Sequence, residues 1–226
     1  MGQMKVKFQS KDSITITADC YKANESNPYI LLFHQAGSSR GEYRDIAGKL
    51  TNLGYNCLAV DLRSGNEMNF VANETADNAK KRNLPTGYLD AEKDMNAAID
   101  YAFEKSGQEV ILFGSSYSAS LSLKIANETA KVKAVVAFSP GEYFNSDLKI
   151  KDQLHDFNKP VFIASTKKEA EYMDELTTYI GSKYKTLFKP NNGNGVHGAR
   201  ALWESNSSSE EYWLALLVFF SKMAPK

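Results

Sequence analysis

Short apolar runs rich in β-branched and aromatic residues alternate with segments of helical periodicity along most of this chain. Strands that are separated by helices pair in parallel, and a parallel sheet is covered by helices on both faces. The expected strands are residues 6–8, 14–21, 29–34, 56–60, 109–113, 134–138, 160–164 and 185–188, and the expected helices are residues 41–53, 88–103, 117–128, 168–180 and 199–223. The pattern predicts an α/β fold with a mainly parallel sheet of about eight strands. Because no repeat or low-complexity linker divides the chain, we expect residues 1–226 to form one domain.

Composition and charge argue against several classes of protein. Hydrophobic residues make up 42% of the chain and charged residues 24%, which is ordinary for a soluble enzyme. The 27 Lys and Arg residues are balanced by 27 Asp and Glu residues. The longest basic cluster is residues 80–82, which we interpret as a solvated helix end or loop. Since nucleic acids and anionic membranes are bound through basic patches, we expect neither as a partner.

The apolar runs and the first residues bear on location. The longest apolar run near the end of the chain, residues 214–220, is too short to span a bilayer. The opening residues, MGQM, lead directly into a strand-like pattern without the features of a signal peptide. We therefore expect a cytoplasmic protein. No residue pattern indicates an oligomeric state.

Cysteines and histidines are few and dispersed. Cys20 and Cys57 lie in apolar predicted strands, which is typical of buried free thiols. His34, His155 and His197 are far apart, and no close Cys/His pair or HExxH spacing occurs. We therefore expect no metal site and no cofactor.

The strongest chemical signal is the segment VILFGSSYSA, residues 110–119, in which a buried strand runs into a helix across small residues. This is the context of a nucleophile elbow, a tight turn that raises a serine hydroxyl above the carboxyl edge of a sheet. The pattern places Ser116 at the top of that turn. It also places the Tyr117 N–H at the helix start, where it can donate to a developing oxyanion.

Other interpretations of this serine-rich turn stay open. Ser115 and Ser118 are rival nucleophiles, but Ser115 falls too early in the turn and Ser118 lies on the helix. A run of serines at a helix start is also typical of a simple N-cap. We prefer Ser116 because its downstream partners are present.

A second signal is ILLFHQAGSS, residues 30–39, a buried strand that ends in histidine and a small-residue loop. In folds with a nucleophile elbow, the loop after the third strand supplies a second oxyanion donor from its backbone. We assign that donor to the Ala36 N–H, with Gln35 as the alternative. An ordinary glycine-containing turn is the competing interpretation. His34 is expected to be a structural hydrogen-bonding group beneath this loop.

The remaining two roles fall in the last third of the chain. His197 lies in a Gly/Asn-rich loop between the last strand and the last helix, from which a catalytic histidine can reach a nucleophile. His155 lies in an amphipathic segment and is expected at the surface. Glu169 follows the strand 160–164 and is predicted to accept a hydrogen bond from His197 and to fix its tautomer. Glu171 and Asp174 are alternative acids, and Glu169 could instead be a carboxylate favoured by a helix N-terminus.

These motifs resemble the α/β-hydrolase superfamily, and within it the compact dienelactone hydrolases and small carboxylesterases. The resemblance runs from about residue 29 to the end and includes the His-Gln-Ala-Gly turn, the segment 54–63, the elbow and the Val-His-Gly loop. The resemblance implies the order Ser, acid, His, with Glu169 in the place of the acid. Three residues depart from the commoner pattern: Gln35 stands for Gly, Ser118 for the second elbow Gly, and Glu169 for Asp.

The resemblance implies two-step acyl transfer on a small-molecule ester through an acyl-enzyme at Ser116. The segments that can form lids in this fold are residues 62–86, which are irregular, and residues 139–159, which we expect to form a loop and a short helix ending near residue 157. Both are short, so we expect a minimal lid and small or moderately sized acyl groups. Candidate pocket-lining residues are Met68, Phe70, Tyr143 and Phe144. A thioesterase, a lactonase, a peptidase and a non-catalytic binding protein on the same fold are the alternatives.

Overall fold

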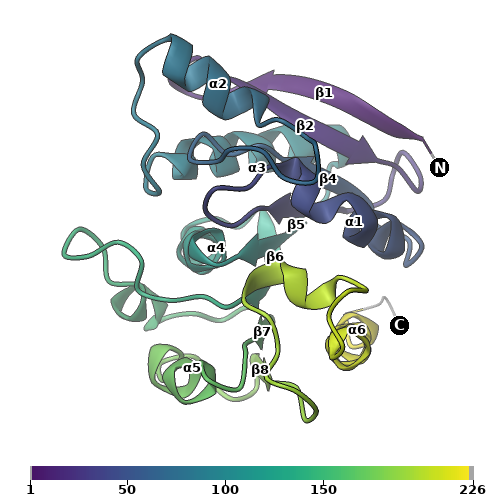
Figure 1. Cartoon of the computed structure of the whole chain (residues 1–226), viewed down its shortest axis with the longest axis vertical. Coiled ribbons are helices and arrows are strands. Elements are labelled where there is room, and N and C mark those ends of the chain that lie inside the picture. The colour runs from purple at the N-terminus through teal and green to yellow at the C-terminus, as the bar shows by residue number, and fades with distance from the viewer. Residues whose placement is uncertain (1, 224–226) are drawn as a thin grey trace.

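The strands pair in the order β1-β2-β4-β3-β5-β6-β7-β8 in the computed structural model, which describes residues 2–223 (Figure 1). The pairs β1–β2 and β2–β4 are antiparallel, and all the others are parallel. The strands are β1 (Gln3–Gln9), β2 (Thr15–Tyr21), β3 (Tyr29–Phe33), β4 (Asn56–Val60), β5 (Val110–Ser115), β6 (Val132–Phe138), β7 (Val161–Ala164) and β8 (Lys185–Phe188). The mainly parallel eight-stranded sheet expected from the alternation of strand and helix patterns is thereby confirmed.

Helices cover both faces of the sheet, as Figure 1 shows with the sheet between them. The α-helices are α1 (Arg44–Thr51), α2 (Glu74–Lys81), α3 (Ala91–Ser106), α4 (Tyr117–Glu128), α5 (Ala170–Leu176) and α6 (Ser209–Ser221). Three short 3-10 helices are η1 (Arg40–Tyr43), η2 (Lys151–Leu154) and η3 (Gly198–Leu202). One apolar core lies between the sheet and α3, α4 and α5, and a second lies between the sheet and α1, η3 and α6.

The central strands are buried along their whole length. Every residue of β3, β4 and β5 is buried, which explains why these segments are continuous apolar runs rather than alternating patterns. The edge strands β1 and β8 are mostly partly or fully exposed. Because β3 to β8 all run in the same direction, their carboxyl ends lie at one edge of the sheet.

Several elements match the sequence-based boundaries, and one was missed. Strands β4 and β8 and helix α4 have the predicted bounds, whereas α3 and α5 are displaced or shortened. The prediction of an irregular segment over residues 62–86 is wrong, because it contains α2. This helix is capped by Asn73, whose side chain accepts the Ala76 N–H, and it buries only small side chains. Its only apolar residues are Ala76 and Ala79, so no large apolar side chain marks this helix in the sequence.

Two segments are expected to form a minimal lid. The one after β4 contains a tight hairpin in which Met68 pairs with Val71, and the one after β6 contains η2. Phe70, at the tip of the hairpin, is 97% exposed. Among residues 2–223, no helix has the length and apolar character needed to cross a bilayer.

Candidate active site

Ser116 lies in a sharp turn between β5 and α4. Its backbone has φ 61° and ψ −124°, a strained conformation for a residue other than glycine, and its N–H donates to the Phe138 carbonyl at 2.8 Å. A Cβ on Gly114 would lie 2.4 Å from the Ala119 Cα, so only glycine permits the turn to close. Ser116 is 7% exposed. This is the strand–turn–helix geometry of a nucleophile elbow.

The neighbouring serines have structural roles. Both Ser115 and Ser118 are fully buried. The Ser118 Oγ accepts the Ser115 N–H at 2.9 Å and donates to the Phe33 carbonyl at 2.7 Å, which links the elbow to β3. The Ser115 Oγ accepts the Ala199 N–H at 2.8 Å. Within residues 2–223, the Ser116 hydroxyl has no main-chain hydrogen bond of the kind that holds Ser115 and Ser118.

The loop after β3 faces the elbow and distinguishes between the two candidate oxyanion donors. The Gln35 N–H donates to Glu42 Oε2 at 3.0 Å, so Gln35 is not available as a donor. Within residues 2–223, the N–H groups of Ala36 and Tyr117 have no hydrogen-bond acceptor. Ala36 is exposed and Tyr117 starts α4, where the amides carry partial positive charge. Of the two predicted donors in this loop, the geometry favours Ala36.

His34 supports the same loop from below, as expected. Its Nε2 accepts the Leu62 N–H at 2.9 Å, and its Nδ1 lies 2.8 Å from the Gln35 carbonyl. These two contacts assign the ring proton to Nδ1. Burial lowers the pKa of His34, so the ring remains neutral. His34 is therefore a brace between the loops that follow β3 and β4.

His197 and Glu169 meet above the carboxyl edge of the sheet. The His197 Nδ1 lies 2.6 Å from Glu169 Oε1, although the two residues come from separate loops after β8 and β7. With Nδ1 bonded to the carboxylate, Nε2 is the ring nitrogen left to accept a proton. Among the hydrogen bonds of the described residues, none joins His197 to Ser116. Catalytic contacts of this type are often long before substrate binds.

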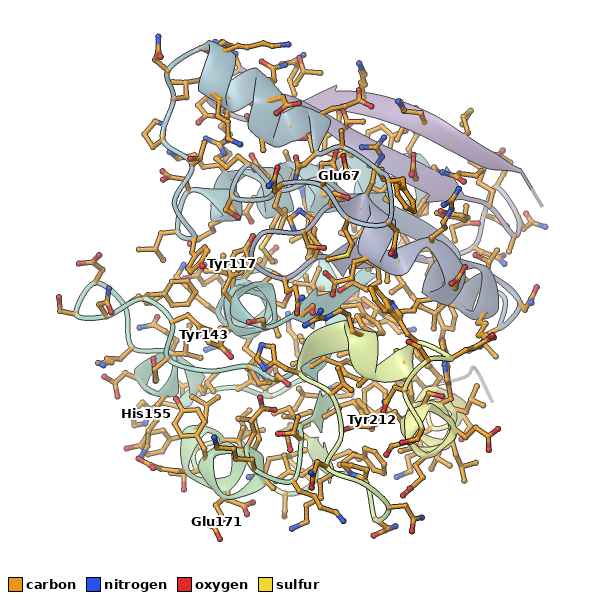
Figure 2. All side chains as sticks on the ribbon, viewed as in Figure 1. Glu67, Tyr117, Tyr143, His155, Glu171 and Tyr212 are labelled. Carbon is orange, nitrogen blue, oxygen red and sulfur yellow. The ribbon has the colours of Figure 1, made fainter. Side chains whose placement is uncertain are left out.

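The Glu169 carboxylate is held in its ionised form. Burial favours the neutral acid, but hydrogen bonds from His197, the Thr166 N–H and Ser139 outweigh burial and lower the pKa of Glu169 from 4.5 to about 2. The alternative acids Glu171 and Asp174 are exposed on α5. Figure 2 shows Glu171 pointing away from the body of the protein. His155 is likewise at the surface, stacked on Tyr179 with ring centroids 3.6 Å apart.

The loop that carries His197 is tied down at both sides, although its composition suggests flexibility. The Asn191 and Asn192 N–H groups donate to Glu211 of α6 at 2.7 and 3.0 Å. The Lys167 N–H donates to the Asn194 carbonyl at 3.0 Å. These contacts place His197 on a fixed support rather than on a free segment.

Sequence reasoning missed Ser139, which follows β6. Its Oγ donates to Glu169 Oε2 at 2.8 Å and accepts the Gly198 N–H at 3.1 Å. The Tyr143 hydroxyl donates to the Ser139 carbonyl at 2.9 Å. Ser139 directly follows a parallel strand that neighbours β5, and this position is the one sequence signal that could have indicated it.

A hollow of about 300 Å³ lies between residues 87–90 and 143–147 and is lined partly by Tyr88, Tyr143 and Phe144. Tyr88 stacks on Tyr117, with ring centroids 4.5 Å apart. Tyr117 and Tyr143 both pack against the core on the α4 side of the sheet (Figure 2). Of the predicted pocket residues, Tyr143 and Phe144 border this hollow, whereas the highly exposed Phe70 borders a separate, open hollow beside Trp203.

Neither the two cysteines nor a metal site contributes to this site within residues 2–223. Cys20 and Cys57 are buried and unpaired, and burial raises the pKa of Cys57 to about 12. A thiol with a raised pKa is a poor nucleophile. Over residues 2–223, no group of three or more His, Cys, Asp or Glu side chains has the arrangement of a metal site.

A sequence model of the dienelactone hydrolase family matches residues 16–186. A search of curated proteins gives no significant match.

Solved structures share the fold over nearly the whole chain. An esterase of Pyrococcus furiosus is similar with a TM-score of 0.74 at 17% identity, covering 98% of this chain and 92% of that one. A dienelactone hydrolase from Anabaena variabilis has a TM-score of 0.70 at 16% identity, with 96% and 95% covered. An α/β hydrolase from a Penicillium species has a TM-score of 0.74 at 12% identity, with 98% and 99% covered. At these identities the similarity establishes the fold.

Proposed function

The chain belongs to the dienelactone hydrolase family, and from this we propose that it is a serine hydrolase that cleaves esters through an acyl-enzyme at Ser116. His197 is the general base, and Glu169 orients it. The observation that carries the proposal is the 2.6 Å contact between His197 Nδ1 and Glu169 Oε1, at the sheet edge where Ser116 occupies a nucleophile elbow. The loop after β7 carries the ionised carboxylate, and the loop after β8 carries the histidine that it contacts.

The proposed reaction has two steps. The Ser116 Oγ attacks the ester carbonyl carbon while His197 Nε2 takes the hydroxyl proton. The Ala36 and Tyr117 N–H groups donate to the oxyanion, which collapses as His197 returns the proton to the departing alcohol. Water, deprotonated by His197, then attacks the acyl carbonyl, and the acid leaves as Ser116 regains its proton. Glu169 stays ionised and stabilises the charged imidazolium in both steps.

The substrate is proposed to be a small or moderately sized ester. Of the two segments that could form a lid, one carries a tight hairpin and the other the short helix η2. Thioesters, lactones and peptides would pass through the same acyl-enzyme, so a substrate panel decides among them. Higher activity on long-chain lipid emulsions than on short soluble esters would contradict the proposed size.

The test of the function is covalent labelling of Ser116. Wild-type protein treated with a fluorophosphonate should gain the mass of one adduct, and Ser116→Ala should gain none. On p-nitrophenyl acetate, Ser116→Ala and His197→Ala should each lower kcat by about 10⁴-fold or more, because the triad acts as a unit.

Ser118→Ala is the matched control, since it removes a hydroxyl from the same turn. It should lower stability through the lost bonds to Ser115 and Phe33 while the folded fraction still forms the adduct. A folded wild-type protein that forms no adduct would point instead to a binding protein on a hydrolase fold.

A further inference from the structure

Ser139 adopts an unusual backbone conformation at the carboxyl end of β6. It is followed by Pro140, its φ is 51°, and it is almost completely buried. A residue other than glycine in this region costs on the order of 1 kcal/mol and persists where the surroundings require it. Glycine would relieve this strain, so the serine side chain itself needs an explanation.

The Ser139 hydroxyl connects the loops that carry Glu169 and His197. It donates to Glu169 Oε2 at 2.8 Å and accepts the Gly198 N–H at 3.1 Å. The Thr166 N–H also donates to Oε2, at 2.9 Å. With two donors on Oε2, the carboxylate is held with Oε1 toward the ring of His197.

The main chain of Ser139 extends the connection toward the elbow. Its N–H donates to the Ala164 carbonyl at 2.7 Å, and its carbonyl accepts the Tyr143 hydroxyl at 2.9 Å. Burial raises the pKa of Tyr143, and a hydrogen bond with the Ser116 hydroxyl opposes that rise. Ser139 thus joins Glu169 and the His197 loop on one side to the neighbour of Ser116 on the other.

We infer that Ser139 is a positioning residue, whose hydroxyl sets the direction of the Glu169 carboxylate and locks the His197 loop against it. The inference rests on the proposed function of this site. Without the hydroxyl, Oε2 loses a donor and the carboxylate can rotate away from His197. The base would then be misoriented in the transition state, whereas substrate binding would be little changed.

Two variants separate the hydroxyl from the backbone strain. Ser139→Ala removes the hydroxyl and keeps the strained backbone, whereas Ser139→Gly removes the hydroxyl and relieves the strain. We expect both to lower kcat by about 10-fold or more, as losses of orienting partners do, with KM changed by less than about twofold. Ser139→Gly should be the more stable of the two in thermal unfolding.

Ser120→Ala is the matched control. The Ser120 hydroxyl is fully buried, donates to the Gly141 carbonyl at 2.7 Å and accepts the Gly141 N–H at 2.8 Å. It therefore supports the same loop without touching Glu169. We expect Ser120→Ala to lower stability while kcat stays within about threefold of wild type, since it removes no orienting partner.

Proton NMR reads the Glu169–His197 bond without turnover. The far-downfield His197 Nδ1–H resonance, assigned by its absence in His197→Ala, should shift or broaden in both Ser139 variants and stay unchanged in Ser120→Ala. Wild-type kcat in Ser139→Gly, or activities that simply follow stability across the three variants, would overturn the inference. A wild type inert to the fluorophosphonate would sink the proposed function, yet the resonance would still report whether Ser139 orients the pair.

Discussion

At the scale of single residues, the ionised state of Glu169 links the site to the stability of the fold. Three donors surround its carboxylate: the His197 ring, the Thr166 N–H and the Ser139 hydroxyl. They lower the pKa from 4.5 to about 2 against the opposing effect of burial. A carboxyl group whose pKa falls on folding stabilises the native state wherever it is ionised.

Glu169→Gln should therefore lower the free energy of unfolding by roughly 3 kcal/mol at neutral pH, the equivalent of this pKa shift. The folded pKa is the lower one, so the contribution is complete above about pH 4.5 and is lost as the pH falls toward 2. Urea denaturation at a series of pH values should show the gap between wild type and variant narrowing below pH 4.5.

Glu171→Gln is the control for this pH series, because Glu171 lies two residues further along, in the first turn of α5, and is exposed. Its unfolding free energy should stay close to that of wild type throughout. A gap for Glu169→Gln that stays constant or widens on acidification would show that the carboxylate is not stabilised as an anion.

At the scale of elements, the β5–α4 turn depends on glycine in a way that α1 does not. A Cβ on Gly114 would lie 2.5 Å from the Ala119 N and 2.6 Å from the Ser118 carbonyl oxygen, both backbone atoms that cannot move aside easily. A Cβ on Gly48, inside α1, would meet nothing within 4 Å. The same substitution should therefore have opposite effects at these two positions.

Gly114→Ala should lower the free energy of unfolding by more than about 2 kcal/mol through forced backbone shifts and should abolish reaction with the fluorophosphonate. Gly48→Ala should stabilise the protein by about 0.5–1 kcal/mol, the helix-propensity difference, with labelling unchanged. Thermal unfolding and intact-mass measurement of both variants test this. Normal labelling in Gly114→Ala would mean that the elbow has room to relax.

The elements also show which features of the fold could be predicted from the sequence. β4 and α4 could be bounded because apolar runs and small turn residues act locally, whereas α2 has a polar sequence and only small buried side chains. The candidate site residues next to strand ends could be proposed for the same local reason. The contribution of Ser139 was not, because its partners lie far away in the chain and are brought near only by the order of the strands.

At the scale of the whole molecule, a buried ion cluster fastens the antiparallel β1–β2 hairpin to the parallel part of the sheet. Arg63, which follows β4, is fully buried and bonds to Asp94 of α3 at 2.6 Å and to Asp12 of the β1–β2 turn at 2.6 Å. Burial raises the pKa of Asp94, and Arg63 opposes the rise. Loss of the guanidinium would leave the buried Asp94 carboxylate without a counter-charge, although the backbone N–H of residue 63 would still donate to it, at 2.8 Å in the wild type.

Arg63→Met should therefore lower the free energy of unfolding by about 3–5 kcal/mol, as breaking a buried pair does. Lys131→Met is the control, because the Lys131–Asp100 pair is partly exposed on both sides, and it should cost less than about 1 kcal/mol. Urea denaturation of the two variants measures both. Equal effects would show that the cluster around Arg63 adds nothing beyond a surface ion pair.

The order of the strands also governs when the site can form during folding. Ile30 lies beside Ile111, and the elbow is bonded to Phe33 on one side and to Phe138 on the other, so its nearest neighbours in space are distant in the chain. Pairings that close such long loops come late and make folding slow. The turn that holds Ser116, the proposed nucleophile, is therefore assembled only when the long-range pairings of the central sheet are complete. A nascent or partly folded chain would therefore be catalytically inactive, and the appearance of hydrolytic activity would mark the end of folding.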